Sequence, residues 1–275
     1  MKDGNGNMDA GEYTPDGPAQ PAISNWSVDD SGDIWSASPA GAPAIRHYLF
    51  KGLDSKGNPV YYGTNNAPCP NPGPDPPRCV EEFQTPSEFG APSSYCNATG
   101  DPCTGVMRAY YVPSSHTMYL SGFPPALPKL PAEDQYTTLG REIARYDNWD
   151  QNCPTGTERS CAPVWSITDL PYQMTSPYDN VARSMDLTCG RLLVGIQAVA
   201  PNQFFPEVRV YDTANGALLD RRRPGPEVAG KSGQNINPAG MNAFQRSNGE
   251  ILVFMEELLN AKWNSFFLVR GSRRR

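Results

Sequence analysis

The sequence lacks any apolar run that approaches the roughly 20 residues a helix needs to cross a bilayer. Its N-terminus is polar and carries no apolar segment of the signal-peptide type. These absences argue against a transmembrane helix. They leave a cytosolic protein, a mature secreted protein and a fragment as open alternatives. Histidine is also scarce, with 2 residues among 275, which disfavours a zinc site.

The motifs of several catalytic classes are absent as well. There is no GxSxG, no HExxH, no P-loop and no CxxCH for haem attachment. His47 and His116 have no serine or cysteine context, so each is expected to be structural or solvated. The acidic residues Asp29, Asp30 and Asp33 flank a Ser-Gly pair. This cluster is interpreted as a turn, with glycosidase-type carboxylates as the alternative.

The net charge and the loop composition further limit the kinds of protein that this sequence could encode. A formal net charge of −6 argues against a nucleic-acid surface, and the short arginine runs at 221–223 and 273–275 are interpreted as solvated. The chain has 29 prolines and 25 glycines, which cluster between apolar runs. That distribution indicates long ordered loops on a β scaffold.

Residues 185–219 carry the clearest secondary-structure pattern. Alternating apolar residues lead to a Cys189-Gly190 turn, and the apolar run 192–194 follows. Asn215-Gly216 lies between two further apolar runs, which predicts a type I′ turn with positive φ at both residues. The stretch therefore predicts two consecutive hairpins, or four short antiparallel strands.

The first of these hairpins recurs along the chain. Its second strand begins near Ile34, Met118, Leu192 and Ile251 in four copies. A more polar strand pair is expected after it, at 46–50 with 60–62 in the first copy, at 141–146 with 164–167 in the second and within 208–219 in the third. The fourth copy has one such strand, at 266–269, and lacks the last one.

Four-stranded repeats of this kind resemble the blades of a β-propeller, and the chain is similar to bacterial secreted propeller-like repeat proteins. We therefore expect an all-β, propeller-like domain over 23–275. Its blades should lie near 23–63, 106–170, 183–220 and 241–270, and a long loop should span 64–105. Trp26, Trp35, Trp165 and Phe254 are expected to fill the core.

The number of blades leaves alternatives open. The chain is interpreted as the C-terminal four blades of a larger propeller, completed by N-terminal blades or by a second copy. A compact four-bladed ring is one alternative. Two unrelated small β domains split near residue 105 are another.

Six of the seven cysteines form close pairs in polar loops. A local disulfide would pin each loop and contribute about 2–3 kcal/mol, which fits an oxidising compartment. The predicted pairs are Cys69 with Cys79, Cys96 with Cys103, and Cys153 with Cys161. Cys189 is left over, either free or paired outside this chain. Asn97 begins a glycosylation sequon that is relevant only in a eukaryotic secretory pathway.

Residues 1–12 (MKDGNGNMDAGE) resemble the calcium loop of EF-hands and dockerins. The resemblance implies structural Ca²⁺ held by Asp3, Asn5, the Asn7 carbonyl, Asp9 and Glu12. Two features depart from that pattern. Met1 stands where the first ligand is expected, and no amphipathic helix follows. The missing ligand predicts that the chain begins inside a longer natural sequence.

Together these observations predict a non-catalytic, calcium-stabilised binding scaffold for an unknown protein or glycan ligand. Its expected location is extracellular, periplasmic or on the cell surface, with neither nucleic acid nor a membrane span involved. The alternative is an enzyme module, either a quinoprotein-like oxidoreductase or a carbohydrate-active propeller. No adjacent-cysteine pair of the quinoprotein type is present, which counts against the first of these.

Overall fold

The structure is a computed structural model that describes residues 25–37, 44–62, 80–83, 85–86, 88–89, 106–122, 142–153, 162–167, 181–197, 199–200, 203–204, 207–222, 238–257 and 262–268. These residues form strands almost throughout. The exceptions with regular structure are a single-turn helix, α1 (Trp149–Asn152), and a 3-10 turn, η1 (Pro113–Ser115). The expected all-β class is confirmed. Within the described ranges, no helix is long and apolar enough to cross a membrane.

The strands form four antiparallel sheets that follow one another along the chain, and two small ribbons. Sheet 1 has the order β1 (Asn25–Val28), β2 (Ile34–Ala37), β3 (Ile45–Tyr48), β6 (Val80–Phe83). Sheet 2 has the order β7 (Val106–Val112), β8 (Thr117–Gly122), β9 (Glu142–Tyr146), β10 (Trp165–Ile167). Sheet 3 has the order β11 (Val181–Thr188), β12 (Arg191–Gln197), β15 (Glu207–Asp212), β16 (Leu218–Arg222).

Sheet 4 contains three strands among the described residues. They are β17 (Pro238–Gln245), β18 (Ile251–Glu257) and β19 (Lys262–Leu268). The two ribbons pair β4 (Phe50–Leu53) with β5 (Pro59–Tyr61), and β13 (Val199–Ala200) with β14 (Gln203–Phe204).

The four predicted inner hairpins are all present. They pair β1 with β2, β7 with β8, β11 with β12, and β17 with β18. The predicted second pairs of the later copies are also confirmed, as β9 with β10 and β15 with β16. Apolar alternation was sufficient here because each hairpin buries one or both faces against a neighbouring sheet.

Sheet 1 differs from its prediction at the fourth strand. Residues 50–53 and 59–61 pair with each other in a separate ribbon. The fourth strand is instead β6, which pairs with β3 and lies inside the range 64–105 that the sequence assigns to a loop. The sequence pattern missed β6 because Val80–Phe83 is short and two of its four residues are glutamates.

The turn geometry also differs from the prediction made from the sequence. The type I′ signature of two positive φ angles occurs at Cys189 (52°) and Gly190 (68°). At the predicted type I′ site, Gly216 has a φ of 72° but Asn215 is not among the residues with positive φ. The loop there is wider, because the Asp212 N–H donates to the Ala217 carbonyl over 2.8 Å.

Successive sheets pack face to face, so sheets 2 and 3 each bury one face on the sheet before and the other on the sheet after. Trp35 and Ile45 of sheet 1 share a buried core with Met118 and Leu120 of sheet 2. A second core joins sheets 2 and 3, and a third joins sheets 3 and 4. Each large apolar side chain buried in this way contributes about 1.5–3 kcal/mol relative to exposure.

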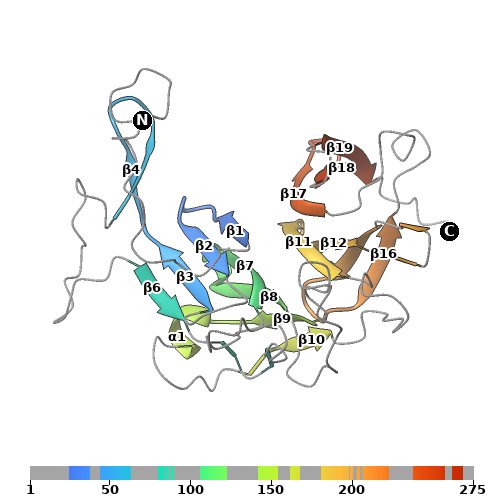
Figure 1. Cartoon of the computed structure of the whole chain (residues 1–275), viewed down its shortest axis with the longest axis horizontal. Coiled ribbons are helices and arrows are strands. Elements are labelled where there is room, and N and C mark those ends of the chain that lie inside the picture. The colour runs from blue at the N-terminus through green and yellow to red at the C-terminus, as the bar shows by residue number, and fades with distance from the viewer. Residues whose placement is uncertain are drawn as a thin grey trace.

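The sheets are arranged in an arc, with β1, β7, β11 and β17 toward its inside (Figure 1). The packing of β1 and β2 on β7, of β7 on β11, and of β11 on β17 joins successive sheets through these innermost strands. Sheets 1 and 4 lie apart at the two ends of the arc (Figure 1). The sheets are therefore blade-like in strand order and in stacking.

Two further expectations are wrong. The first is a division into unrelated domains near residue 105, because one core contains residues from both sides of that position, including Phe83 and Val106. The second is the burial of Trp26, which is 61% exposed. Trp26 lies on the face of sheet 1 that points away from sheet 2, whereas Trp35 points toward sheet 2 and is buried.

Candidate functional site

The turn between β1 and β2 is organised by the side chain of Asp29. One carboxylate oxygen accepts the backbone N–H groups of Ser31 (2.8 Å) and Asp33 (3.1 Å). The other accepts the indole N–H of Trp35 over 2.9 Å. Aspartate favours this role because its short side chain reaches backbone donors two residues on. The turn interpretation of the acidic cluster fits this geometry for Asp29.

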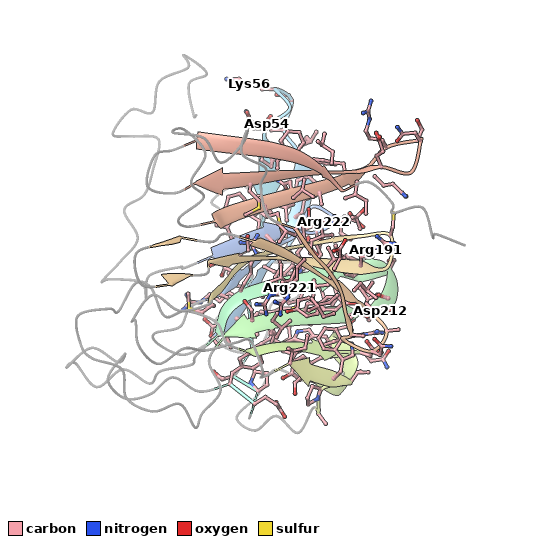
Figure 2. The ribbon with its side chains drawn as sticks, turned by 90° about the vertical axis from the view of Figure 1, so that its right-hand side faces the viewer. Asp54, Lys56, Arg191, Asp212, Arg221 and Arg222 are labelled. Carbon is pink, nitrogen blue, oxygen red and sulfur yellow. The ribbon has the colours of Figure 1, made fainter. Side chains whose placement is uncertain are left out.

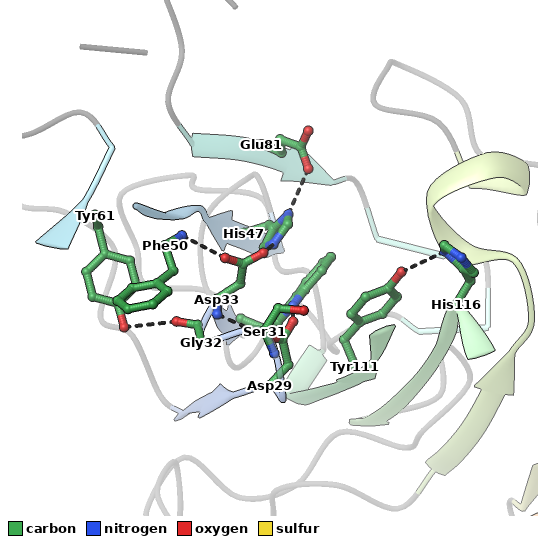
Figure 3. Close-up of polar contacts among 11 residues, drawn as sticks. Asp29, Ser31, Gly32, Asp33, His47, Phe50, Tyr61, Glu81, Tyr111 and His116 are labelled. Atoms are coloured by element: carbon green, nitrogen blue, oxygen red, sulfur yellow. Dashed lines mark hydrogen bonds and ion pairs between the residues drawn. The ribbon is translucent and has the colours of Figure 1, made fainter. Parts of the chain in front are cut away.

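His47 lies between two carboxylates (Figure 3). Its Nε2 is 2.9 Å from an Asp33 oxygen, and its Nδ1 is 2.8 Å from a Glu81 oxygen. β3 pairs with β6, which places His47 directly opposite Glu81, and the β1–β2 turn presents Asp33 from the other side. With a proton on each nitrogen, the imidazolium ring donates to both carboxylates.

The protonated form of His47 is favoured by its surroundings. Burial alone would lower the pKa of the ring, because desolvation penalises the charged form. The hydrogen bonds and negative charges of Glu81 and Asp33 outweigh burial, so the pKa is raised above 6.5. The ring also stacks on Trp35, with centroids 3.9 Å apart and planes within 10°. A cation on an indole face gains further electrostatic stabilisation.

This group also meets the minimum composition of a metal site. Ligand atoms of Asp29, Asp33 and His47 all lie within 4.8 Å of one another. Carboxylate and imidazole ligands suit divalent transition metals. However, each of these side chains already has hydrogen-bond partners on its ligand atoms, and a metal would have to displace the Trp35, Glu81 or backbone contacts. The arrangement therefore fits a structural cluster held by a protonated His47 better than a metal centre.

The same cluster anchors the β4–β5 ribbon. The second oxygen of Asp33 accepts the Phe50 N–H over 2.6 Å, and the Tyr61 hydroxyl donates to the Gly32 carbonyl over 3.1 Å. Gly32 has a φ of 88°, and a Cβ there would lie 2.7 Å from the Phe50 ring. An isolated two-stranded ribbon is marginally stable in water, so these contacts hold its base in place.

The second histidine occupies a more exposed position. His116 follows η1 with a φ of 51°, a left-handed conformation that is costly for most side chains. Its Nδ1 lies 2.8 Å from Asp150 of α1 and 3.2 Å from the Tyr111 hydroxyl. Burial, and then the charges of Asp150 and Asp29, raise the pKa of Tyr111 to about 12. The Tyr111 ring also contacts the Trp35 ring at a tilt of 36°, with centroids 4.5 Å apart.

A second polar cluster joins the innermost strands. Asp186 of β11 accepts the backbone N–H of Ala243 in β17 over 2.5 Å and that of Leu187 over 2.7 Å. The hydroxyl of Tyr110 in β7 is hydrogen-bonded to the same carboxylate. The charge of Asp186 also acts on the buried guanidinium of Arg108, whose pKa burial lowers to about 10. Sheets 2, 3 and 4 are thus tied together at one carboxylate.

The predicted site residues are distributed unevenly over the structure. The calcium-loop residues Asp3, Asn5, Asn7, Asp9 and Glu12 lie outside the described residues, as do Cys69, Cys79, Cys96, Cys103 and Cys161.

The described cysteines are Cys153 and Cys189. Cys153 is buried and disulfide-bonded, with a partner outside the described residues, so its pairing with Cys161 stays a prediction. Cys189 is exposed and free, one of the two states expected for it.

Sequence reasoning missed both polar clusters. His47 and Asp33 were each identified, but neither was paired, because the partner Glu81 lies on the strand that was not predicted. The sequence placed Asp186 inside a predicted hairpin. Its contact with the Ala243 N–H of sheet 4 is what shows that the side chain is part of a cluster between sheets. The register of β3 with β6 is the signal that would have found the first cluster.

No protein-family model matches the chain, and no curated protein sequence is significantly similar to it.

Proposed function

We propose that this protein is a non-catalytic binding scaffold built as an arc of β-propeller-like blades. The observation that supports the proposal is that both ring nitrogens and one ring face of His47 are engaged in contacts within the protein. Both ring nitrogens face carboxylates, and one ring face covers Trp35. A catalytic imidazole needs a nitrogen directed at a substrate. His47 acts instead as a clamp between the β1–β2 turn, β3 and β6.

The β4–β5 ribbon is the element proposed to present a binding surface. It projects from sheet 1 (Figure 1), and Leu53 near its tip is 66% exposed. Asp54 orders the tip by accepting the N–H groups of Lys56 and Asn58, each over 2.8 Å. Figure 2 shows Asp54 and Lys56 at this tip, well separated from Arg191 and Asp212 of sheet 3. An ordered, projecting turn with an apolar side chain suits recognition of a protein or glycan.

Binding to arrays of glycans and of extracellular proteins tests this proposal. The wild type should bind a ligand without converting it, and the double variant Leu53→Ser, Lys56→Ser should lose that binding at an unchanged melting temperature. Arg221→Ser is the matched control, since Arg221 is also exposed but lies on β16. Turnover of a bound glycan that disappears in His47→Gln would contradict the proposal.

Calcium is proposed as a structural ion of residues 1–12. Support comes from the sequence pattern of Asp3, Asn5, Asn7, Asp9 and Glu12, where the ion would offset repulsion among three carboxylates. Calorimetric titration should give one site, and chelation should lower the melting temperature. An absence of both heat and shift would contradict it. Local disulfides and an extracellular, periplasmic or cell-surface location belong to the same proposal.

An enzyme module is the second candidate. The observation in its favour is the convergence of Arg108, Tyr110 and Asp186 on the innermost strands, where propeller enzymes would place polar groups. Against it, Arg108 and Asp186 are buried and contribute to sheet packing. Turnover on a glycan panel, or a quinone absorbance band after reconstitution, would favour this candidate over the scaffold.

A further inference from the structure

The faces of the sheets follow one order along the arc. We call the face toward the preceding sheet the leading face and the face toward the following sheet the trailing face. The trailing face of sheet 1, with Trp35 and Ile45, packs on the leading face of sheet 2, with Met118 and Leu120. The same relation joins sheets 2 and 3 and sheets 3 and 4. Two faces then lie outside this series: the leading face of sheet 1 and the trailing face of sheet 4.

One row of the leading face of sheet 1 is apolar on all four strands, and the next row contains the buried Ser36. Val28, Ile34, Tyr48 and Val80 lie directly opposite one another on four adjacent strands. Val28 is exposed, and the other three are partly buried. Beside this row lies the exposed Trp26. The charged residues of the next row, Arg46 and Glu82, form an ion pair over 3.5 Å and so leave no net charge there.

The trailing face of sheet 4 has the same character. Phe244 and Leu252 are opposite each other, and Phe267 is opposite Leu252 in the register of β18 and β19. Phe244 is 57% exposed, and its ring meets the ring of Phe254 edge-on with centroids 6.0 Å apart. Asn242 is the polar residue opposite Phe254. Contiguous apolar residues on an exposed face mark interaction surfaces more often than single exposed apolar residues do.

We propose that these two faces bind each other between two copies of this chain, head to tail. The leading face of sheet 1 is of the type that packs on a trailing face, and three contacts of this type already exist within the chain. The trailing face of sheet 4 supplies the matching apolar surface, so the new contact continues the series. The row from Val28 to Val80 contains no charged residue, and neither do positions 242, 244, 252 and 254 of the sheet 4 face, so desolvating these apolar rows costs little. Glu256 holds the next register position on the sheet 4 face, at the end of β18 and outside this apolar patch.

A second copy fits better than contact within one chain, because sheets 1 and 4 lie at opposite ends of the arc (Figure 1). The interface is heterologous, since each copy contributes a different face. Heterologous contacts close into a ring when the rotation allows it and extend into a filament when it does not. The inference concerns self-association and does not depend on the ligand-binding function proposed above.

Sedimentation velocity and light scattering across a concentration series test the association. The wild type should associate reversibly, and Trp26→Asp or Phe244→Asp should each weaken association by about tenfold or more, as expected for central aromatic residues of an interface. Leu219→Asp is the control, because it places the same charge on an exposed apolar position of β16, outside both faces. Circular dichroism melts establish that each variant is folded.

Mixing the two interface variants tests the head-to-tail direction. The Trp26→Asp copy retains an intact sheet 4 face, and the Phe244→Asp copy retains an intact sheet 1 face, so the mixture should form a dimer that neither variant forms alone. A wild type that stays monomeric at every concentration would overturn the proposal. So would self-association that Leu219→Asp weakens as strongly as Trp26→Asp, or a mixture that remains monomeric.

Discussion

The two polar clusters of this protein achieve local order by different means. The His47 cluster pairs one imidazolium ring with Asp33 and Glu81, and the Glu81 side chain is 48% exposed. The Asp186 cluster surrounds one buried carboxylate with neutral N–H and O–H donors, and Arg108 adds a buried positive charge nearby. The first cluster relies on charge pairs that are partly exposed to solvent, and the second relies on hydrogen bonds to a buried carboxylate.

The elements that each cluster joins also differ. His47 ties together parts of sheet 1 and the base of the β4–β5 ribbon. Asp186 joins β11 to β17 and to β7, that is, three different sheets. The arc as a whole should therefore depend on Asp186, whereas His47 should control the rigidity of its first sheet.

The most severe test of this comparison is Asp186→Leu. It removes the acceptor of two backbone N–H groups and leaves the Arg108 guanidinium buried without its nearby negative charge. Leaving a buried N–H without its acceptor costs about 1–3 kcal/mol, and two N–H groups lose theirs here. Urea denaturation should show a loss of that size, together with weaker protection of β17 amides in hydrogen exchange.

Asp186→Asn is the matched control for this variant. It retains one acceptor oxygen and the side-chain volume, so its loss should be smaller than that of Asp186→Leu. An unfolding free energy within about 1 kcal/mol of wild type for Asp186→Leu would show that the cluster does not hold the sheets together.

The corresponding test of the first cluster is His47→Phe. Phenylalanine can keep the ring stack on Trp35 but removes both donors, which takes away the positive charge between Asp33 and Glu81. Lost charge-assisted hydrogen bonds at a partly buried site cost about 2–3 kcal/mol. Denaturant unfolding measures this loss, and limited proteolysis of the β4–β5 ribbon should become faster.

Glu81→Gln sharpens the result for His47. It removes one of the two negative charges while keeping an acceptor for Nδ1, and Glu81 is half exposed, so the expected loss is under 1 kcal/mol after solvent screening. Equal losses for His47→Phe and Glu81→Gln would contradict the clamp, because they would assign its strength to the exposed partner.

The contrast between the clusters also shows what the sequence could predict. Alternating apolar residues located all four inner hairpins, since β periodicity is a local property. The Asp33–His47–Glu81 contacts join the β1–β2 turn to β3 and β6, and the Asp186 contacts join three sheets, so both require long-range register. Trp26 and Trp35 lie on adjacent strands, and their side chains are on opposite faces of the sheet. Only the packing of sheet 2 on one face decides which tryptophan is buried.

The two clusters are expected to lose stability over different ranges of pH. Both His47 and Asp186 have raised pKa values, so the stability linked to each is present at low pH and is lost as pH rises through its folded-state pKa. For His47 this loss begins above its ordinary value of 6.5, and for Asp186 above 3.8. Unfolding free energies above pH 6.5 should therefore decline in wild type and decline less in His47→Gln. The same slope in both proteins would exclude His47 as its source.

The smallest effect is expected at His116, which lies next to the same aromatic stack but in solvent. Its ion pair with Asp150 is nearly half exposed on both sides, so His116→Asn should change stability by about 0.5 kcal/mol or less. Asparagine tolerates the positive φ of 51° at this position, whereas alanine does not. His116→Ala should therefore cost about 1 kcal/mol more than His116→Asn, as measured by thermal unfolding. If the two variants were equally stable, backbone conformation would contribute nothing at this turn. A loss at His116→Asn as large as that at His47→Phe would mean that burial does not distinguish the two histidines.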